Sequence, residues 1–192
     1  FDCLGGDPRF EPVVDRILSW GKVNDRWLDN IGSCQPRITV GSPKNDYYMA
    51  EKLKTSSRPQ NVLLLQYTHN SGDLRAVSHN MYTHMIECYR VLRALGYPNI
   101  KLKLHPQPDK WKSSYFKEVA DYYGIDCQII KNQPYNELVG WADIVVGPLV
   151  SGAFSETLAS GKPYYAFLLP PHAMDPEYYA GYPILTSIDE LS

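Results

Sequence analysis

The sequence predicts an α/β fold built on a doubly wound parallel sheet. Short apolar runs, among them 62–65, 100–104 and 144–146, alternate along the chain with segments of helical periodicity. The runs are continuous instead of alternating with polar residues, which is typical of parallel strands buried on both faces. Helices between successive strands are the connections that such a sheet requires.

The first 43 residues predict a small β-α-β unit. An apolar group over 13–20 indicates a strand, apolar residues recur at helical spacing over 23–31, and a β-branched run at 38–40 ends at Gly41-Ser42-Pro43. Such a unit is too small to be a domain. It is either the tail of an N-terminal domain or an added edge of the domain that follows.

The interval 44–60 is charged and polar and predicts a linker, after which residues 61–192 carry the main pattern. Its most regular feature is a stripe of apolar residues at spacings of three and four from Leu74 to Leu95, which predicts a long amphipathic helix. The expected strands are 62–65, 100–104, 127–130, 144–146, 164–169 and 184–186, and the expected helices are 74–95, 111–123, 134–142 and 153–160.

Composition narrows the class of protein. With 192 residues, 44% of them hydrophobic, the chain can bury a core, and a net charge of −2 offers no basic surface for nucleic acid. The four cysteines are scattered without a C-x-x-C pair, which favours reduced thiols in a cytoplasmic protein over disulfides or a zinc site. No apolar run is long enough to span a membrane, and no signal peptide is recognised. Because the chain starts at Phe1 without a Met, we expect an upstream portion to be missing.

The strongest candidate site follows the apolar run 144–146. Small residues at Ser151 and Gly152 precede a helix, and unpaired amides at a helix N-terminus attract phosphate. Ser155 and Glu156 lie in the first turns, where the carboxylate can accept hydrogen bonds from sugar hydroxyls. The alternative is a plain helix cap in which Glu156 complements the helix dipole.

Other strand exits carry further candidates. Ligands of doubly wound folds bind beyond the carboxyl ends of the strands. His105 ends the second strand and can donate a hydrogen bond to a phosphate or carboxylate, although a histidine at such a position is also a common structural residue. Side chains in two exit loops are candidates for substrate contacts, with ordinary capped loops as the alternative: Thr68, His69, Asn70 and Ser71 in the first, and Pro106 and Gln107 in the second.

Three motifs together resemble GT-B glycosyltransferases. Ser151-Gly152, Glu156 and Gly161-Lys162-Pro163 are similar to the nucleotide-sugar loop, in which a Glu five residues before Gly-x-Pro is typical. Lys103-Leu104-His105-Pro106 resembles the His-Pro element of bacterial sialyl-, Kdo- and polyol-phosphate transferases. Gly41-Ser42-Pro43, followed by Asp46, is similar to the Gly-x-Pro segment at the crossover between the two GT-B domains. The resemblance extends over about residues 13–170.

The resemblance implies half of a GT-B fold: residues 1–43 as the remnant of an N-terminal acceptor domain, 44–60 as a linker, and 61–192 as a Rossmann-like domain that binds the nucleotide-sugar donor. It implies transfer of a sugar from a CMP- or UDP-linked donor to a glycan or lipid-linked acceptor in bacterial surface or capsule polysaccharide biosynthesis. The location would be cytoplasmic, or peripheral at the inner membrane.

The same resemblance assigns chemistry to the candidate residues. Tyr135 would stack on the nucleotide base, His105 and the amides near Ser151 and Gly152 would stabilise the departing phosphate, and neither a metal nor a cofactor is needed. The catalytic base usually comes from the N-terminal domain, so no catalytic residue is assigned and the chain alone is expected to be inactive.

Two other functions remain open at this point. A non-hydrolysing UDP-sugar 2-epimerase shares the fold, but it normally has a second Gly directly after Ser-Gly and a pair of Glu residues, where this chain has Ala153 and Glu156. The other alternative is a nucleotide-sugar binding module without turnover.

Overall fold

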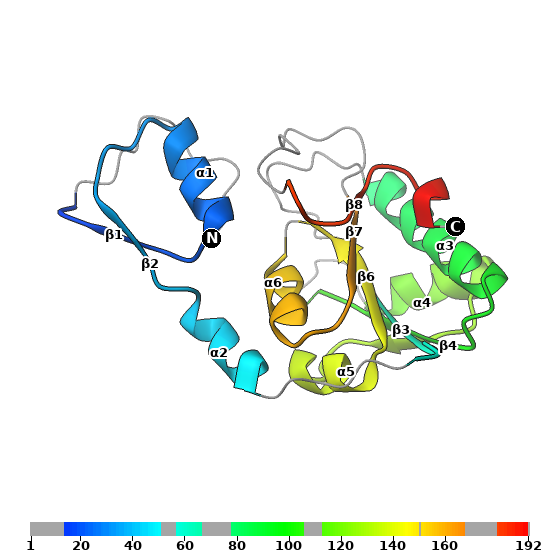
Figure 1. Ribbon diagram of the computed structural model, residues 1–192. Helices are drawn as coiled ribbons and strands as arrows, with labels where there is room; N and C mark the ends of the chain where they lie inside the picture. Colours follow the sequence, from blue (N-terminus) through cyan, green and yellow to red (C-terminus); the bar gives the residue numbers. More distant parts are fainter. Residues whose placement is uncertain are drawn as a thin grey trace.

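The computed structural model describes most of the chain, and the account below concerns the residues 14–50, 57–66, 78–105, 113–149, 151–167 and 180–191. They form a six-stranded sheet covered by helices and a smaller N-terminal unit (Figure 1). Within these ranges no helix combines the length and apolar character that a bilayer crossing requires.

The large sheet is parallel throughout and runs in the order β5-β4-β3-β6-β7-β8. Counted from β3 as the first strand, this is the order 3-2-1-4-5-6 of doubly wound dinucleotide-binding sheets. The predicted α/β fold with a Rossmann-like, doubly wound parallel sheet is therefore confirmed. Its strands are β3 (Asn61–Leu65), β4 (Asn99–Lys103), β5 (Gln128–Ile130), β6 (Ile144–Pro148), β7 (Tyr164–Phe167) and β8 (Ile184–Leu185).

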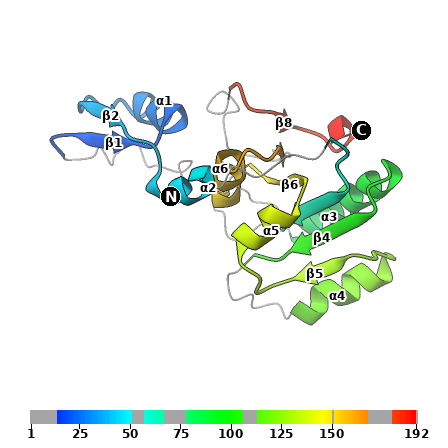
Figure 2. The same cartoon turned by 60° about the horizontal axis from the view of Figure 1, so that its bottom comes forward.

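Helices cover both faces of this sheet (Figures 1 and 2). The apolar side chains of α3 (Ser78–Ala94) and α4 (Ser113–Tyr122) bury one face, and those of α5 (Tyr135–Trp141) and α6 (Gly152–Ala159) bury the other. The alternation of side chains along β3 explains the two layers, because Val62 and Leu64 belong to the first core, whereas Leu63 and Leu65 belong to the second. A short 3-10 turn, Asp189–Leu191, follows β8.

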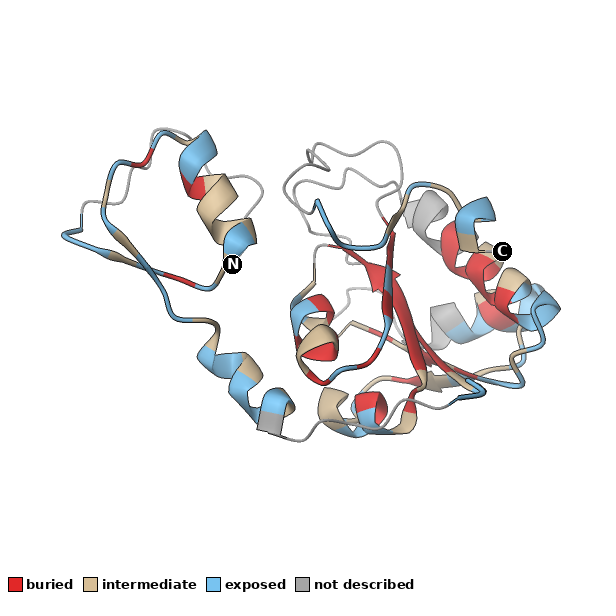
Figure 3. Ribbon diagram, in the orientation of Figure 1, coloured by how far each residue is buried: buried red, intermediate tan, exposed pale blue. Residues whose placement is uncertain are grey.

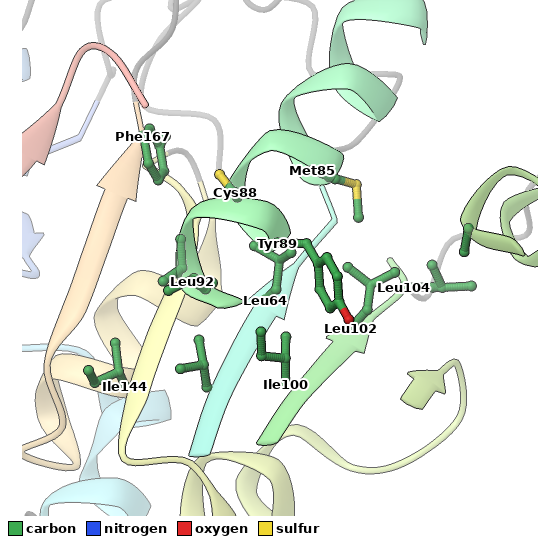
Figure 4. Packing of buried hydrophobic residues seen from close by; sticks show 13 residues of the cluster. Leu64, Met85, Cys88, Tyr89, Leu92, Ile100, Leu102, Leu104, Ile144 and Phe167 are labelled. Atoms are coloured by element: carbon green, nitrogen blue, oxygen red, sulfur yellow. The ribbon is translucent and has the colours of Figure 1, made fainter. Parts of the chain in front are cut away.

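The first core lies between strands of the main sheet and helices, of which α3 contributes the most side chains (Figure 4). Met85, Cys88, Tyr89 and Leu92 are buried and lie at spacings of three and four, as the sequence stripe predicted. They pack on strand residues such as Leu64. The described part of α3 begins at Ser78, so the predicted start at Leu74 lies outside the described residues.

The N-terminal unit forms a sheet of its own. Strands β1 (Ile17–Ser19) and β2 (Arg37–Thr39) pair in parallel, and α1 (Lys22–Asn30) connects them. The unit thus has the β-α-β order that the sequence predicted, and its strands lie outside the six-stranded sheet. Most of its described residues are exposed or half-buried, whereas the central strands β3 and β6 of the main sheet are almost completely buried (Figure 3).

A helix that the sequence did not predict occupies part of the interval expected to be a linker. Helix α2 (Pro43–Ala50) starts at a proline, which is suited to the first helical position because its missing N–H has no partner there. Its apolar residues show no clear stripe, and Tyr47 and Met49 are exposed. The helix lies against α6, far along the chain (Figure 2), so a tertiary contact stabilises it rather than a buried apolar face.

Candidate functional site

The chain changes direction at the centre of the sheet. Strands β3 and β6 are neighbours, but the chain proceeds from β3 toward β4 on one side and from β6 toward β7 on the other. Ligands of open α/β sheets bind outside the carboxyl ends of the strands at such a switch point. A ligand is therefore expected at the exits of β3 and β6, and α6 begins at the exit of β6.

Close approach of the backbone shapes the end of β6. A Cβ added to Gly147 would lie 2.7 Å from the hydroxyl oxygen of Tyr164 and 2.9 Å from Cβ of Leu65. The Tyr164 hydroxyl donates to the carbonyl of Pro148 at 2.8 Å. Glycine is thus the residue that lets β6 pass between its neighbours and deliver the chain to α6.

Helix α6 begins with a side-chain cap. The Ser151 hydroxyl accepts a hydrogen bond from the amide of Ala153 at 3.2 Å, as expected of an N-cap serine. The Ser155 hydroxyl is exposed and donates to the carbonyl of Gly152 at 3.1 Å. Both predicted side chains therefore lie at the first turn of α6, where the helix dipole creates a positive potential. The amides of Ala153 and Phe154 in this turn are themselves paired, with the hydroxyl and the carbonyl of Ser151.

Glu156 is buried one turn further, and α2 holds its carboxylate. The Tyr48 hydroxyl donates to Oε2 of Glu156 at 2.9 Å, and the ammonium of Lys44 forms an ion pair with Oε1. The Glu156 side chain is 8% exposed, whereas the Lys44 side chain is 65% exposed. A carboxylate taken out of water needs such partners, because an unpaired buried charge is costly.

Tyr48 acts in this arrangement as a hydrogen-bond donor. Burial, the hydrogen bond to Glu156 and the negative charge of that carboxylate all raise the pKa of the Tyr48 phenol well above its usual value. The phenol therefore keeps its proton, and it orients Oε2 of Glu156.

Lys44 also lies beside the start of α6. A Cβ on Gly152 would be 3.2 Å from its Nζ and 3.6 Å from Oε1 of Glu156. An exposed ammonium and the positive end of a helix thus lie next to a buried carboxylate. This combination can attract an anion at the helix terminus and offer carboxylate lone pairs to hydroxyl groups of the same ligand.

Tyr135 connects α5 to α6 through its hydroxyl. The hydroxyl oxygen lies 2.5 Å from Oγ1 of Thr157 and 3.2 Å from the carbonyl oxygen of Ala153. Burial is the main cause that raises the pKa of the Tyr135 phenol. The hydroxyl thus faces α6, and stacking of its ring on a base stays a prediction.

His105 is placed at the exit of β4, one strand further from α6. Its backbone amide donates to Oε1 of Gln66 at 3.0 Å, which joins the exits of β3 and β4. Because β3 separates β4 from β6, the exits of β4 and β6 are about 10 Å apart. A ligand of nucleotide size is needed to reach both His105 and α6. The predicted residues Thr68, His69, Asn70, Ser71, Pro106 and Gln107 lie outside the described residues.

Sequence reasoning missed Lys44 and Tyr48. Both lie in the interval taken as a linker, yet their spacing of four residues places them on one face of a helix. Had α2 been recognised, this spacing would have marked a polar face; its partner Glu156, 108 residues further along the chain from Tyr48, would still have been unknown.

The cysteines and acidic residues show no metal-binding arrangement in the described part of the chain. There, no group of three or more His, Cys, Asp or Glu side chains is placed to hold a metal ion. Cys34, Cys88 and Cys127 are free thiols, and burial raises the pKa of the Cys127 thiol to about 11.

Comparison with known proteins shows structural likeness at low sequence identity. No protein-family model and no curated protein sequence matches the chain. Among solved structures, the chain is similar to one described as the glycotransferase of kitacinnamycin, with 15% identity, a TM-score of 0.45 and 87% of this chain covered. The match covers 50% of that protein, so the chain spans half of its length.

Proposed function

We propose that the chain is the donor-binding half of a GT-B glycosyltransferase that moves a sugar from a nucleotide-activated donor to a glycan. The buried Glu156 carboxylate, held beside the first turn of α6 near the switch point of the sheet, carries the proposal. The three sequence motifs support it, since the Ser-Gly and Glu of the resembled loop occupy this turn.

In this proposal each residue binds a different part of the donor. Glu156 accepts hydrogen bonds from ribose hydroxyls, and the start of α6 at Gly152 meets the phosphates. The Ser151 amide already donates to the carbonyl of Leu149 at 3.0 Å, so it is not one of the phosphate contacts. Lys44, beside Gly152, adds positive charge where the departing nucleotide phosphate develops negative charge. His105 reaches the phosphates from the exit of β4.

The wider assignment extends the same proposal. Residues 1–43 are the end of an acceptor domain that supplies the catalytic base and holds a glycan or lipid-linked acceptor. The exposed apolar side chains of Leu18, Trp20 and Ile38 in the N-terminal unit support this, because parallel strands are normally covered on both faces. The parent enzyme acts in the cytoplasm in bacterial surface polysaccharide assembly.

Calorimetric titration of the chain with CMP, UDP, CDP and GDP sugars tests the proposal. We expect one of these donors to bind the wild type. Glu156→Gln should lower the affinity for that donor about 10- to 100-fold, as expected for loss of a charge-assisted hydrogen bond. Glu118→Gln, on the exposed surface of α4, is the matched control and leaves binding unchanged. Absence of binding by all four classes of donor, or equal affinity of the Glu156 variant and the wild type, would contradict the donor site.

A further inference from the structure

The contact between α2 and α6 centres on one carboxylate. Both oxygens of Glu156 are engaged from α2, one by Lys44 and the other by Tyr48. A weaker hydrogen bond, from Nδ2 of Asn136 to the hydroxyl of Tyr47 at 3.3 Å, joins α2 to α5. Because Tyr47 and Met49 are exposed, little apolar burial supports these polar contacts.

Lys44 and Glu156, the two partners of the ion pair, differ in burial. An ion pair to a lysine that is 65% exposed adds little to stability, because water screens it and its side chain is flexible. The Glu156 carboxylate, in contrast, is almost completely buried and needs fixed partners to hold one orientation. The arrangement therefore does more to fix the carboxylate than to stabilise the fold.

Helix α2 also carries the N-terminal unit. Only Val40, Gly41 and Ser42 separate β2 from α2, and Gly41 has a positive φ of 77°. The unit also contacts the main domain through a hydrogen bond from Arg26 to the carbonyl of Ala180 at 3.3 Å and through packing of Val23 against the second core. Docking of α2 on Glu156 thus helps to determine where the N-terminal unit lies.

We infer that Lys44 and Tyr48 are positioning residues for Glu156, so that ligand binding at this carboxylate and docking of α2 strengthen each other. The inference rests on the proposed function. A carboxylate has about four lone-pair sites, and α2 uses two of them. In this inference the remaining lone-pair sites are the ones that ligand hydroxyls take, and an acceptor that is already oriented loses little entropy on binding. Coupling of this kind is reciprocal, so the ligand holds α2 as firmly as α2 favours the ligand.

Two substitutions in α2 test the inference, each with a matched control. Lys44→Met and Tyr48→Phe remove one partner of Glu156 each. Lys117→Met removes a lysine that pairs with Asp121 on α4, and Tyr122→Phe alters a tyrosine that is 83% exposed. The nucleotide is whichever of CMP, UDP, CDP and GDP binds the wild type most tightly. Its dissociation constant is measured by calorimetry, and hydrogen exchange of the α2 amides is followed with and without it.

We expect three results from calorimetry and hydrogen exchange. Each α2 substitution weakens binding of the nucleotide about tenfold, whereas both controls keep the wild-type affinity. The nucleotide slows exchange in α2 of the wild type, and this protection is reduced in Lys44→Met and Tyr48→Phe. Without nucleotide, both variants exchange faster in α2 than the wild type does.

Other outcomes separate the inference from the proposed function. If a nucleotide binds the wild type but Lys44→Met and Tyr48→Phe bind it equally well, or if it leaves exchange in α2 unchanged, the inference is wrong and the donor site stands. If no nucleotide binds the wild type, the proposed function and its coupling to α2 both fail. Hydrogen exchange of the α2 amides in the nucleotide-free wild type and variants then still shows whether Lys44 and Tyr48 hold α2 against Glu156.

Discussion

The hydroxyl of Tyr135 on α5 and the hydroxyl of Thr157 on α6 lie 2.5 Å apart, and Thr157 also donates to the carbonyl of Ala153 at 2.6 Å. Thr157 is completely buried and directly follows Glu156. The hydrogen bond therefore fixes the rotation of α6 about its axis at the residue next to the proposed ligand contact.

Tyr135→Phe is expected to destabilise the protein by about 1 kcal/mol, since it removes the contacts of the hydroxyl with Thr157 and with the carbonyl of Ala153 but leaves Thr157 its carbonyl partner. Urea unfolding measures the change. If the ring of Tyr135 stacks on a base, as the sequence predicts, the variant keeps the ring and binds nucleotide almost normally. Tyr122→Phe serves as control, because that hydroxyl is on the surface. Equal stability of the two variants would show that the hydroxyl contributes nothing.

Gly147→Ala is expected to destabilise the protein by about 1–3 kcal/mol, because its Cβ would overlap the Tyr164 hydroxyl and Cβ of Leu65. Gly140→Ala is the matched control: it lies in α5 with no atom within 4 Å of the added Cβ, so alanine there is expected to stabilise the helix by about 0.5–1 kcal/mol. Thermal or urea unfolding of both variants measures the change in the free energy of unfolding, which is expected to have opposite signs in the two variants. A neutral Gly147→Ala would mean that β6 can shift without cost.

Stability is expected to fall below pH 6.5 because of His84. The imidazole is buried in the core, with its ring centroid 4.7 Å from that of Phe167. This burial lowers the pKa of His84 from 6.5 to about 4. Between these pH values the unfolded chain binds a proton that the folded chain does not, so the stability present above pH 6.5 is lost as pH falls toward 4. The full loss from this group is about 3 kcal/mol.

Urea unfolding from pH 7 to pH 4 measures this dependence, and His84→Leu is the comparison because it cannot take up the proton. The difference in stability between the wild type and this variant should change steadily over the interval. A difference that is constant with pH would mean that His84 titrates normally in the folded protein.

Lys162 of the Gly161-Lys162-Pro163 motif has a structural role in this chain. Its side chain is buried, and the ammonium donates to the carbonyl of Ala142 at 2.7 Å, which joins the end of α6 to the end of α5. Lys162→Met is expected to cost about 1–3 kcal/mol, because the buried carbonyl loses its donor. Calorimetric unfolding measures the effect, with Lys117→Met as the control because that lysine is exposed. Wild-type stability of Lys162→Met would contradict the structural role.

The strands and the helices between them were predictable from the sequence, because the signals are local. The apolar run at 62–65 becomes β3, and the stripe that ends at Leu95 becomes α3. Continuous apolar runs indicate burial on both faces, and Gly96, with a positive φ of 86°, marks the end of a helix where the predicted pattern stopped. The N-cap at Ser151 was likewise visible in the spacing of small residues before an apolar helix.

The tertiary structure alone decided the partners of Glu156. The sequence placed Glu156 near the start of a helix and left open whether it complements the helix dipole or binds a ligand. Neither alternative included Tyr48 or Lys44, because a hydrogen bond or ion pair between segments 108 or more residues apart has no local periodicity to reveal it. Helix α2 was hidden for the same physical reason: its own residues bury little apolar surface, so it is held by the helix on which it docks.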